Sequence, residues 1–266
     1  MLTDPKATKV RGVAKLTKKD ARSSTGLFLL EGPQGLKEAL ERPRLIVELY
    51  ATEEAVSRYP ELFDRAESKR IQVQLVTEPV LKALSDTTTP QGVVAVCEQL
   101  DVSLDDVLEA KPTLIAFLAN IRDPGNAGTV LRAADAAGAD AVIFSSNSVD
   151  VYNPKVVRST TGSIFHLPIV IDIDIETAIE KFKAAGIQVF AANGGGEQIP
   201  DLKPEVLQAP TAWVFGNEAW GFEQSTLDQV DREVAVPLYG AAESLNLATA
   251  ASICLYASAF AQNTGA

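Results

Sequence analysis

The sequence predicts an α/β protein in two parts, a smaller α/β unit followed by a larger domain built on a parallel sheet. From residue 112 onward, short apolar runs alternate with loops and with segments of helical periodicity, which is typical of a parallel sheet covered by helices. Residues 1–98 show a similar alternation on a smaller scale. Between the two parts, residues 99–111 are acidic with only scattered apolar residues, so they are the best domain boundary and form a linker or a short helix.

In the first part, residues 1–22 form a polar, basic leader that lacks the apolar stretch of a secretory signal. Runs rich in Leu, Val and Ile predict the strands that follow, at 27–30, 46–50, 71–76 and 92–97. Helical periodicity predicts the helices between them, at 33–41, 53–66 and 79–83. Pro33 lies near the start of the first of these helices, where its missing N–H costs nothing.

The sequence pattern of the second part predicts five buried strands and three helices. The strands are expected at 114–118, 141–144, 188–191, 212–215 and 234–236. The helices are expected at 129–137, 177–185 and 244–260. In an open α/β sheet, ligands bind in the loops outside the carboxyl ends of the strands. The loops after these strands are therefore where we expect a functional site.

Composition and charge limit the function classes. The chain has 266 residues, 46% of them hydrophobic, with no apolar run near the roughly 18–20 residues that a membrane span requires. The net charge of −11 is divided unevenly, with +1 over residues 1–98 and −12 over residues 99–266. Because phosphate contacts need local rather than global positive charge, the basic leader keeps a nucleic-acid partner possible. Cys97 and Cys254 lie in apolar runs, which indicates buried thiols, a reducing compartment and a cytoplasmic protein.

Three loops of the second part carry most of the polar signal. The first contains Asn126, Gly128 and Arg132, the second is Gly216-Asn-Glu-Ala-Trp-Gly221, and the third runs from Pro237 to Glu243-Ser-Leu-Asn246. In order and spacing, they resemble the three motifs of the SpoU (TrmH-type) RNA ribose 2′-O-methyltransferases of the SPOUT class. The resemblance covers about residues 112–262. The first part is similar to the ribosomal-protein-like RNA-binding domain that often precedes this catalytic domain.

The resemblance implies a parallel-sheet domain, residues 112–266, with a deep trefoil knot, after an RNA-binding domain, residues 1–98. It implies a homodimer that transfers a methyl group from S-adenosylmethionine to a ribose 2′-hydroxyl, most readily in 23S rRNA. No metal is needed, because the sulfonium already activates the methyl group. Two alternatives stay open, a tRNA 2′-O-methyltransferase and a non-catalytic RNA-binding protein. A dehydrogenase is disfavoured because the glycine fingerprint of dinucleotide sites is missing.

The resemblance also implies roles for individual residues. The catalytic candidates are Arg132, Asn126, Glu218, Ser244 and Asn246. Gly216, Val236 and Leu245 are expected to bind the cofactor, the last two on the resemblance alone. Arg132 acts either as a base or as an electrostatic stabiliser that holds a phosphate, and the sequence does not choose between these roles. From residue type alone, Asn126 and Ser244 could equally be helix caps.

Basic residues supply the RNA-binding candidates. They are Arg122, Lys155 and Arg158 in the second part and Lys9, Arg11, Lys18 and Lys19 in the leader. Arg122, Arg132, Lys155 and Arg158 could form a phosphate-binding strip. Three further features have weaker interpretations: Gly194–Gly196 as a turn or one edge of the cofactor cleft, His166 as a packed residue, and Trp220 as a departure from a position that is usually small or charged.

Overall fold

The computed structural model describes residues 1–264 and divides into two compact units. The N-terminal unit contains residues 1–100 together with residues 152–165, and the C-terminal unit contains 101–151 and 166–266. Residues 152–165, which lie in the second part by sequence position, therefore pack with the first unit. Within the described residues, no helix has both the length and the apolar character of a membrane span.

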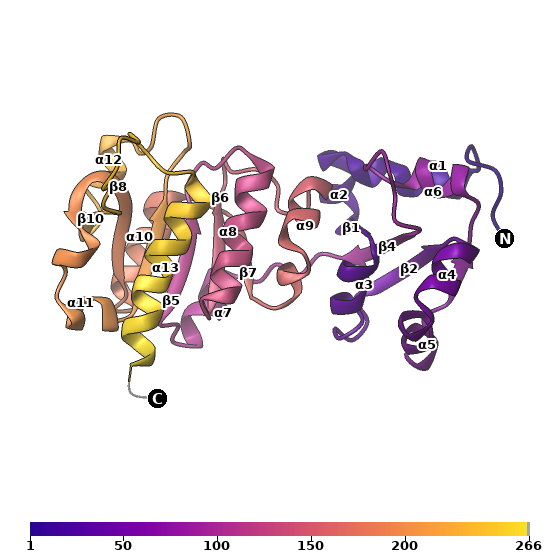
Figure 1. The fold of residues 1–266 in the computed structure, drawn as a ribbon, viewed down its shortest axis with the longest axis horizontal. Helices are drawn as coiled ribbons and strands as arrows, with labels where there is room; N and C mark the ends of the chain where they lie inside the picture. The colour runs from indigo at the N-terminus through magenta and orange to yellow at the C-terminus, as the bar shows by residue number, and fades with distance from the viewer. Residues whose placement is uncertain (265–266) are drawn as a thin grey trace. The chain divides into compact units, whose positions relative to one another are not determined.

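The N-terminal unit contains a four-stranded mixed sheet with strand order β1-β4-β2-β3. Its strands β1, β2 and β4 are labelled in Figure 1. Strand β4 is antiparallel to both β1 and β2, and β2 is parallel to β3. Its helices and strands are α1 (Thr8–Ala14), η1 (Lys15–Thr17), α2 (Lys19–Thr25), β1 (Leu27–Glu31), α3 (Pro33–Ala39), β2 (Ile46–Ala51), α4 (Glu53–Arg58), α5 (Pro60–Ser68), β3 (Val73–Leu75), α6 (Glu78–Leu84), β4 (Val93–Glu98), α9 (Pro154–Thr160) and η2 (Ser163–Phe165).

The basic leader forms α1, η1 and α2, and its first two helices pack Val10, Val13 and Leu16 into the core of the unit. One prediction for this unit needs correction. The helix predicted over 53–66 is split in two at Tyr59, whose φ of −126° and ψ of 54° are not helical. Proline explains the break, since it disfavours the α conformation in the residue before it and cannot donate a helical hydrogen bond.

The C-terminal unit is a six-stranded parallel sheet with strand order β10-β8-β9-β5-β6-β7. The predicted parallel sheet is confirmed, and β7 is a strand that the sequence analysis missed. The elements are α7 (Leu104–Glu109), β5 (Leu114–Leu118), α8 (Pro124–Ala136), β6 (Ala141–Ser145), β7 (Ile169–Ile173), α10 (Ile175–Ala184), β8 (Gln188–Gln198), η3 (Ile199–Asp201), α11 (Pro204–Gln208), β9 (Thr211–Phe215), α12 (Gln224–Leu227), β10 (Arg232–Ala235) and α13 (Leu247–Asn263).

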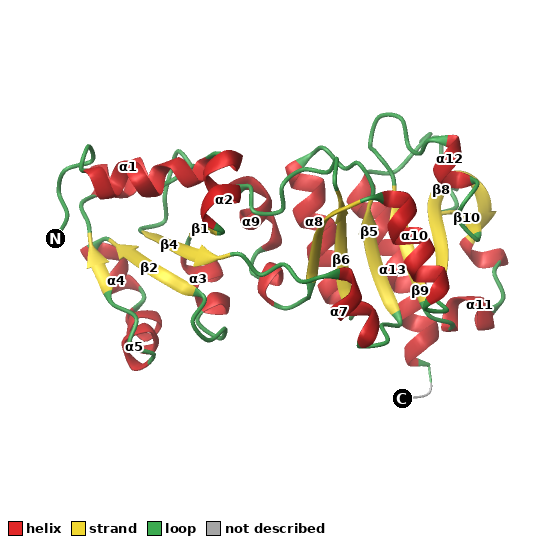
Figure 2. Cartoon of the chain, turned by 180° about the vertical axis from the view of Figure 1, so that it is seen from behind, coloured by secondary structure: helices red, strands yellow, loops and turns green. Residues whose placement is uncertain are grey.

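Helices cover both faces of this sheet, which is why its central strands are apolar throughout. Figure 1 shows α8 and α13 side by side over one face, and Figure 2 shows α10 and α7 over the other. All five residues of β5, and all five of β9, are buried. The loops after β5, β9 and β10 leave from the same edge of the sheet and lead into the functional site.

Candidate functional site

A cleft of about 330 Å³ lies at the carboxyl end of the parallel sheet. The residues that line it come from β8 and β10, from the start of α8 and the first turn of α13, and from the loops after β9 and β10. The lining residues are Asn126, Ala192, Asn193, Gly194, Gly216, Asn217, Glu218, Gly221, Phe222, Val234, Val236, Leu238, Glu243, Ser244, Leu245, Asn246, Leu247 and Ala250. Seven of the eight predicted catalytic and cofactor residues are among them, and the exception is Arg132.

The loop after β9 is a tight hairpin, and its glycines are needed for the geometry. Asn217 and Gly221 exchange two backbone hydrogen bonds of 2.9 Å each. A Cβ atom on Gly216 would lie 2.7 Å from the carbonyl oxygen of Gly221, so no larger residue fits there. Gly221 adopts a φ of +68°, which L side chains rarely take. The hairpin holds Glu218 at the wall of the cleft.

Asn217 is a site residue that the sequence analysis missed. The residue is 5% exposed, and its Nδ2 donates to the carbonyl oxygen of Asn120 at 2.7 Å. Its Oδ1 accepts from the backbone N–H of Ala219 at 2.8 Å. Asn217 therefore joins the loop after β9 to the loop after β5. The available signal was an amide side chain next to a glycine at a strand end, where a buried polar group needs partners.

Glu218 makes a second connection between the same two loops. Its carboxylate accepts hydrogen bonds from the backbone N–H groups of Arg122 at 3.3 Å and Asp123 at 3.2 Å, and from Nδ2 of Asn126 at 3.2 Å. The side chain thus fixes the N-terminal turn of α8 while its carboxylate lines the cleft. A carboxylate suits this position because it can accept several hydrogen bonds at once.

Asn126 and Asn246 extend the network to the third loop. Nδ2 of Asn246 donates to Oδ1 of Asn126 at 3.0 Å. Oδ1 of Asn246 accepts from the backbone N–H of Ala248 at 2.9 Å, so Asn246 is the N-cap of α13. The structure thus contradicts the cap interpretations of Asn126 and Ser244, because Asp123 caps α8 and Asn246 caps α13. Ser244 instead lines the cleft.

The cleft has apolar walls and an acidic lining. Its apolar lining residues include Val234, Val236, Leu238, Leu245 and Leu247. Glu218 and Glu243 are its acidic residues, and the residues lining the cleft include no Lys, Arg or His. Gly194 lies at its edge within the long strand β8, so the glycine run is part of a strand and of the cleft rather than a free turn.

Arg132 is exposed on α8 and does not line the cleft. It follows Asn126 by six residues, so on an ideal helix it lies about 9 Å further along the axis and about 120° around it. Asn126 faces the cleft, and Arg132 therefore projects from another side of the same helix.

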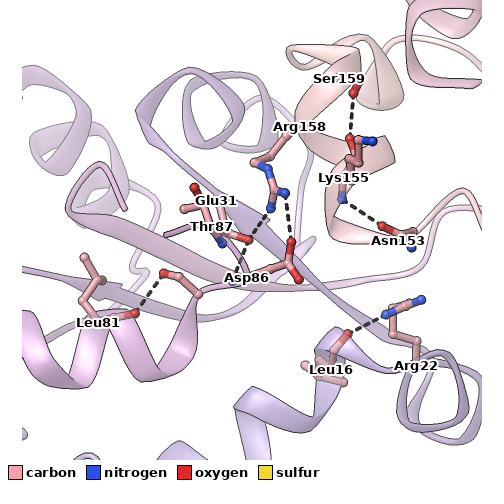
Figure 3. A network of polar contacts seen from close by, with 11 residues as sticks. Leu16, Arg22, Glu31, Leu81, Asp86, Thr87, Asn153, Lys155, Arg158 and Ser159 are labelled. Atoms are coloured by element: carbon pink, nitrogen blue, oxygen red, sulfur yellow. Dashed lines mark hydrogen bonds and ion pairs between the residues drawn. The ribbon is translucent and has the colours of Figure 1, made fainter. Parts of the chain in front are cut away.

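Arg158, a predicted RNA-binding residue, is held inside the N-terminal unit (Figure 3). Its guanidinium forms ion pairs with Glu31 at 2.8 Å and Asp86 at 2.9 Å. Glu31, whose side chain is 5% exposed, also accepts from the backbone N–H groups of Asp86 and Thr87. Arg158 thus attaches α9 to β1 and to the loop after α6, a role that the sequence did not indicate.

The remaining RNA-binding candidates are exposed. Lys155 lies on α9 in the N-terminal unit, while Arg122 and Arg132 belong to the C-terminal unit, so the four residues of the expected strip are divided between units. In the leader, Arg11, Lys18 and Lys19 are exposed. Lys9 pairs with Glu48 at 3.5 Å and lies 5.5 Å from the ring centroid of Tyr50.

His166 differs from its expected role as a packed residue. It is exposed, and its Nδ1 lies 2.7 Å from Oδ2 of Asp135. Both cysteines are free and buried, as expected. Burial raises the pKa of both thiols, that of Cys254 to about 12. Among residues 1–264 there is no group of three His, Cys, Asp or Glu side chains that could hold a metal ion.

Two family models match the chain. Residues 113–256 match the SpoU rRNA Methylase family, and residues 29–102 match a model described as RNA 2′-O ribose methyltransferase substrate binding. The chain is 35% identical over 255 residues to the 23S rRNA (guanosine(2553)-2′-O)-methyltransferase RlmP of Bacillus subtilis, covering 94% of this chain and 96% of that protein. It is 30% identical to the 23S rRNA (uridine(2479)-2′-O)-methyltransferase of Streptomyces viridochromogenes, covering 91% and 86%.

Solved structures agree with these matches. The crystal structure of the SpoU methyltransferase AviRb from Streptomyces viridochromogenes in complex with AdoMet has a TM-score of 0.83 and 28% identity, covering 97% of this chain and 100% of that one. An AdoMet-bound rRNA methyltransferase from Sinorhizobium meliloti has a TM-score of 0.82 and 29% identity, covering 97% and 96%. Because a family model matches more than half of its residues and a relative of 35% identity covers nearly all of it, the chain belongs to the SpoU rRNA methylase family.

Proposed function

We propose that this protein transfers a methyl group from S-adenosylmethionine to a ribose 2′-hydroxyl of 23S rRNA. The observation that carries the proposal is the hydrogen-bond network from Glu218 through Asn126 to Asn246, which joins the three motif loops around one cleft. The family membership and the substrates named for the relatives support the choice of rRNA. We place the reaction in the cytoplasm, where rRNA is available.

The cleft suits S-adenosylmethionine in size and charge. Its volume of about 330 Å³ lies within the range of roughly 300–1,000 Å³ that is usual for small-molecule sites. Two carboxylates and no basic side chain line it, an arrangement that favours a cation and disfavours the phosphates of NAD. When bound, S-adenosylmethionine would supply an activated methyl group. Gly216 gives space for close approach, Val236 offers backbone groups, and Leu245 supplies an apolar wall.

The chain's own residues would orient the ribose and stabilise the charge that develops on its hydroxyl. Asn126 and Asn246 are fixed by their mutual hydrogen bond, and Ser244 lies beside them on the cleft wall. We assign Arg132 the electrostatic role, holding a phosphate of the RNA and stabilising the developing alkoxide, because an arginine side chain keeps its proton in proteins. Since Arg132 does not line the cleft of its own chain, this role needs either an approach of the RNA across α8 or a second copy.

We infer that the protein forms a homodimer. Helix α13 carries Ile253 and Phe260 with 40% and 69% of their surface exposed, and because they are seven residues apart they lie on one face of the helix. An interface that covers this helix would bury them and would allow the Arg132 of one copy to approach the cleft of the other. Light scattering measures the mass of the assembly, and a monomer with full activity would contradict the inference.

We assign RNA capture to the N-terminal unit. It carries 17 Lys and Arg against 14 Asp and Glu, a net charge of +3, whereas the C-terminal unit carries seven against 21, a net charge of −14. Phosphates are therefore attracted mainly to the N-terminal unit, where Arg11, Lys18 and Lys19 are exposed. Replacing these three residues with Ala should weaken RNA binding and flatten its salt dependence while leaving cofactor binding unchanged. RNA affinity equal to wild type would contradict this assignment.

Two measurements test the proposed function. Calorimetry should show binding of S-adenosylmethionine and S-adenosylhomocysteine and none of NAD. Mapping of 2′-O-methyl positions in 23S rRNA and tRNA, from cells with and without the gene, should show one rRNA position that loses its methyl group. A lost tRNA position with unchanged rRNA would favour the tRNA alternative, and no lost position would favour the non-catalytic one.

A further inference from the structure

Two exposed aromatic side chains lie beside the cleft, and nothing in the chemistry described so far uses them. Trp220 has 56% of its surface exposed and Tyr239 has 89%. We call this pair the rim aromatics. Large aromatic side chains are normally buried for most of their area, as Trp213 and Tyr152 are in this protein. The exposure of two of them near one cleft indicates a surface that receives a partner.

The loops that carry the rim aromatics are the loops that form the cleft. Trp220 lies between Glu218 and Gly221, which both line the cleft, and Tyr239 directly follows Leu238, which also lines it. The Trp220 hairpin is held by the backbone pair between Asn217 and Gly221 and by the hydrogen bond from Asn217 to the loop after β5. Neither residue lines the cleft itself, so both exposed rings lie next to it and are not committed to the cofactor.

The charge of the C-terminal unit indicates what kind of contact they make. The unit has a net charge of −14, and Glu218 and Glu243 lie in the cleft wall. Apart from the phosphate assigned to Arg132, RNA phosphates gain little electrostatic attraction here, so the nucleotides next to the target ribose need another source of affinity. Stacking of unpaired bases on aromatic rings supplies it, because each base has a π face and the contact does not depend on opposite charges.

We propose that Trp220 and Tyr239 stack against unpaired nucleobases of the RNA that flank the target ribose and thereby hold that ribose at the cleft. This inference rests on the proposed function, because it takes the ligand at the opening to be the RNA substrate.

Steady-state kinetics with an unmodified 23S rRNA transcript tests the proposal. Trp220→Ala and Tyr239→Ala should each raise KM for the transcript about tenfold or more, whereas Trp220→Phe and Tyr239→Phe should restore most of the loss. The dissociation constant for S-adenosylhomocysteine and the mass of the assembly should stay at their wild-type values. Val102→Ala, which shortens another exposed apolar side chain of the same unit, is the matched control and should leave KM unchanged.

Fluorescence provides a direct readout, because the chain contains two tryptophans in contrasting environments. Trp213 is fully buried and donates a hydrogen bond to Ser258 at 2.9 Å, while Trp220 is exposed. Binding of the transcript should quench the emission of Trp220, and Trp220→Phe should abolish that quenching. The slope of log affinity against log salt should be the same in wild type and Trp220→Ala, because stacking releases no counterions.

The alternatives give different results. Unchanged KM in both alanine variants, with an active wild type, would overturn the inference. So would a loss of S-adenosylhomocysteine affinity that accounts for the change in KM, which would make the aromatics a cover for the cofactor. Dissociation of the assembly in these variants would identify a contact between two copies instead. If the wild type does not methylate rRNA, the proposed function fails, and quenching of Trp220 by the transcript then decides the inference alone.

Discussion

Replacing Glu218 tests the central network most directly. Its carboxylate accepts three hydrogen bonds at 3.2–3.3 Å from the loop after β5 and from Asn126. The groups are solvent-accessible and the distances are long, so each bond contributes about 0.7 kcal/mol, near the lower end of the usual range. The three bonds together stabilise the ordered arrangement of the motif loops by about 2 kcal/mol, which corresponds to roughly a thirtyfold change in an equilibrium constant. Glu218→Ala should therefore weaken S-adenosylhomocysteine binding by up to about thirtyfold.

Calorimetry with two ligands separates the network from direct charge attraction. S-Adenosylhomocysteine lacks the sulfonium charge, so its loss of affinity reports loop order, and any additional loss with S-adenosylmethionine reports attraction to the carboxylate. Glu218→Gln keeps one acceptor oxygen and should lie between wild type and Glu218→Ala. Glu223→Gln is the control, since Glu223 forms no capping hydrogen bond to α12. An affinity of Glu218→Ala within twofold of wild type for both ligands would refute this account of the site.

Further predictions concern catalysis, stability and thiol chemistry. Arg132→Ala and Arg132→Lys should both lose most methyl transfer to rRNA while binding S-adenosylmethionine normally, since lysine lacks the planar fork; near-normal turnover in a radiolabel assay would exclude the proposed role. Arg158→Ala should lower the free energy of unfolding of the N-terminal unit, measured in urea, by about 2–3 kcal/mol, because it removes the cation beside a nearly buried carboxylate. Weaker RNA binding without any loss of stability would instead support the prediction from the sequence that Arg158 binds RNA. Cys97 and Cys254 should not react with a thiol reagent at pH 8 until the protein is denatured, since burial raises the pKa of both; rapid native reaction would contradict their burial. Hydrogen bonds from the backbone N–H and hydroxyl of Thr177 lower the pKa of Asp174. The ionised carboxylate therefore stabilises α10 above the ordinary carboxyl pKa of about 4, and this stabilisation is lost as pH falls through the lower pKa of the folded state. Asp174→Ala should lower the free energy of unfolding by about 1 kcal/mol at pH 7 and by less near pH 2.

The sequence predicted the parallel sheet because its strands are apolar on both faces, as β5 and β9 show. It missed β7, whose last three residues are only partly buried or exposed and which contains the polar Asp172. It also missed the packing of residues 152–165 with the N-terminal unit, because that packing depends on partners far along the chain, such as Phe28, whose ring centroid lies 4.9 Å from that of Tyr152. The trefoil knot stays a prediction, since strand order does not describe how the chain is threaded.

In the site as well, features set by neighbouring residues were predictable from the sequence, and features set by distant residues were not. The glycines of the hairpin were predictable, because a strand that turns back within five residues needs positions without a Cβ. The cap at Asn246 was not, because Ser244 and Asn246 are both good cap residues and the choice depends on where α13 begins. Arg158 was assigned to RNA on its charge, yet a carboxylate 127 residues away binds it. Charge patterns reveal that a cation needs a partner, and only the fold decides whether the partner is a ligand or another part of the protein.

The hydrogen-bond network also makes the three motifs depend on one another. Asn126 accepts from Asn246 and donates to Glu218, so each of its amide atoms is used by a different loop. An amide suits this position, because Asp would present a second carboxylate to Glu218 and Leu would remove one hydrogen bond from each neighbour. The same atoms lie on the cleft wall, so the geometry offered to the ribose and the cofactor is set by bonds between loops rather than within any one of them. A substitution in one motif should therefore alter the geometry of all three. The effects of Glu218→Ala and Asn246→Ala on cofactor affinity should then be clearly less than additive.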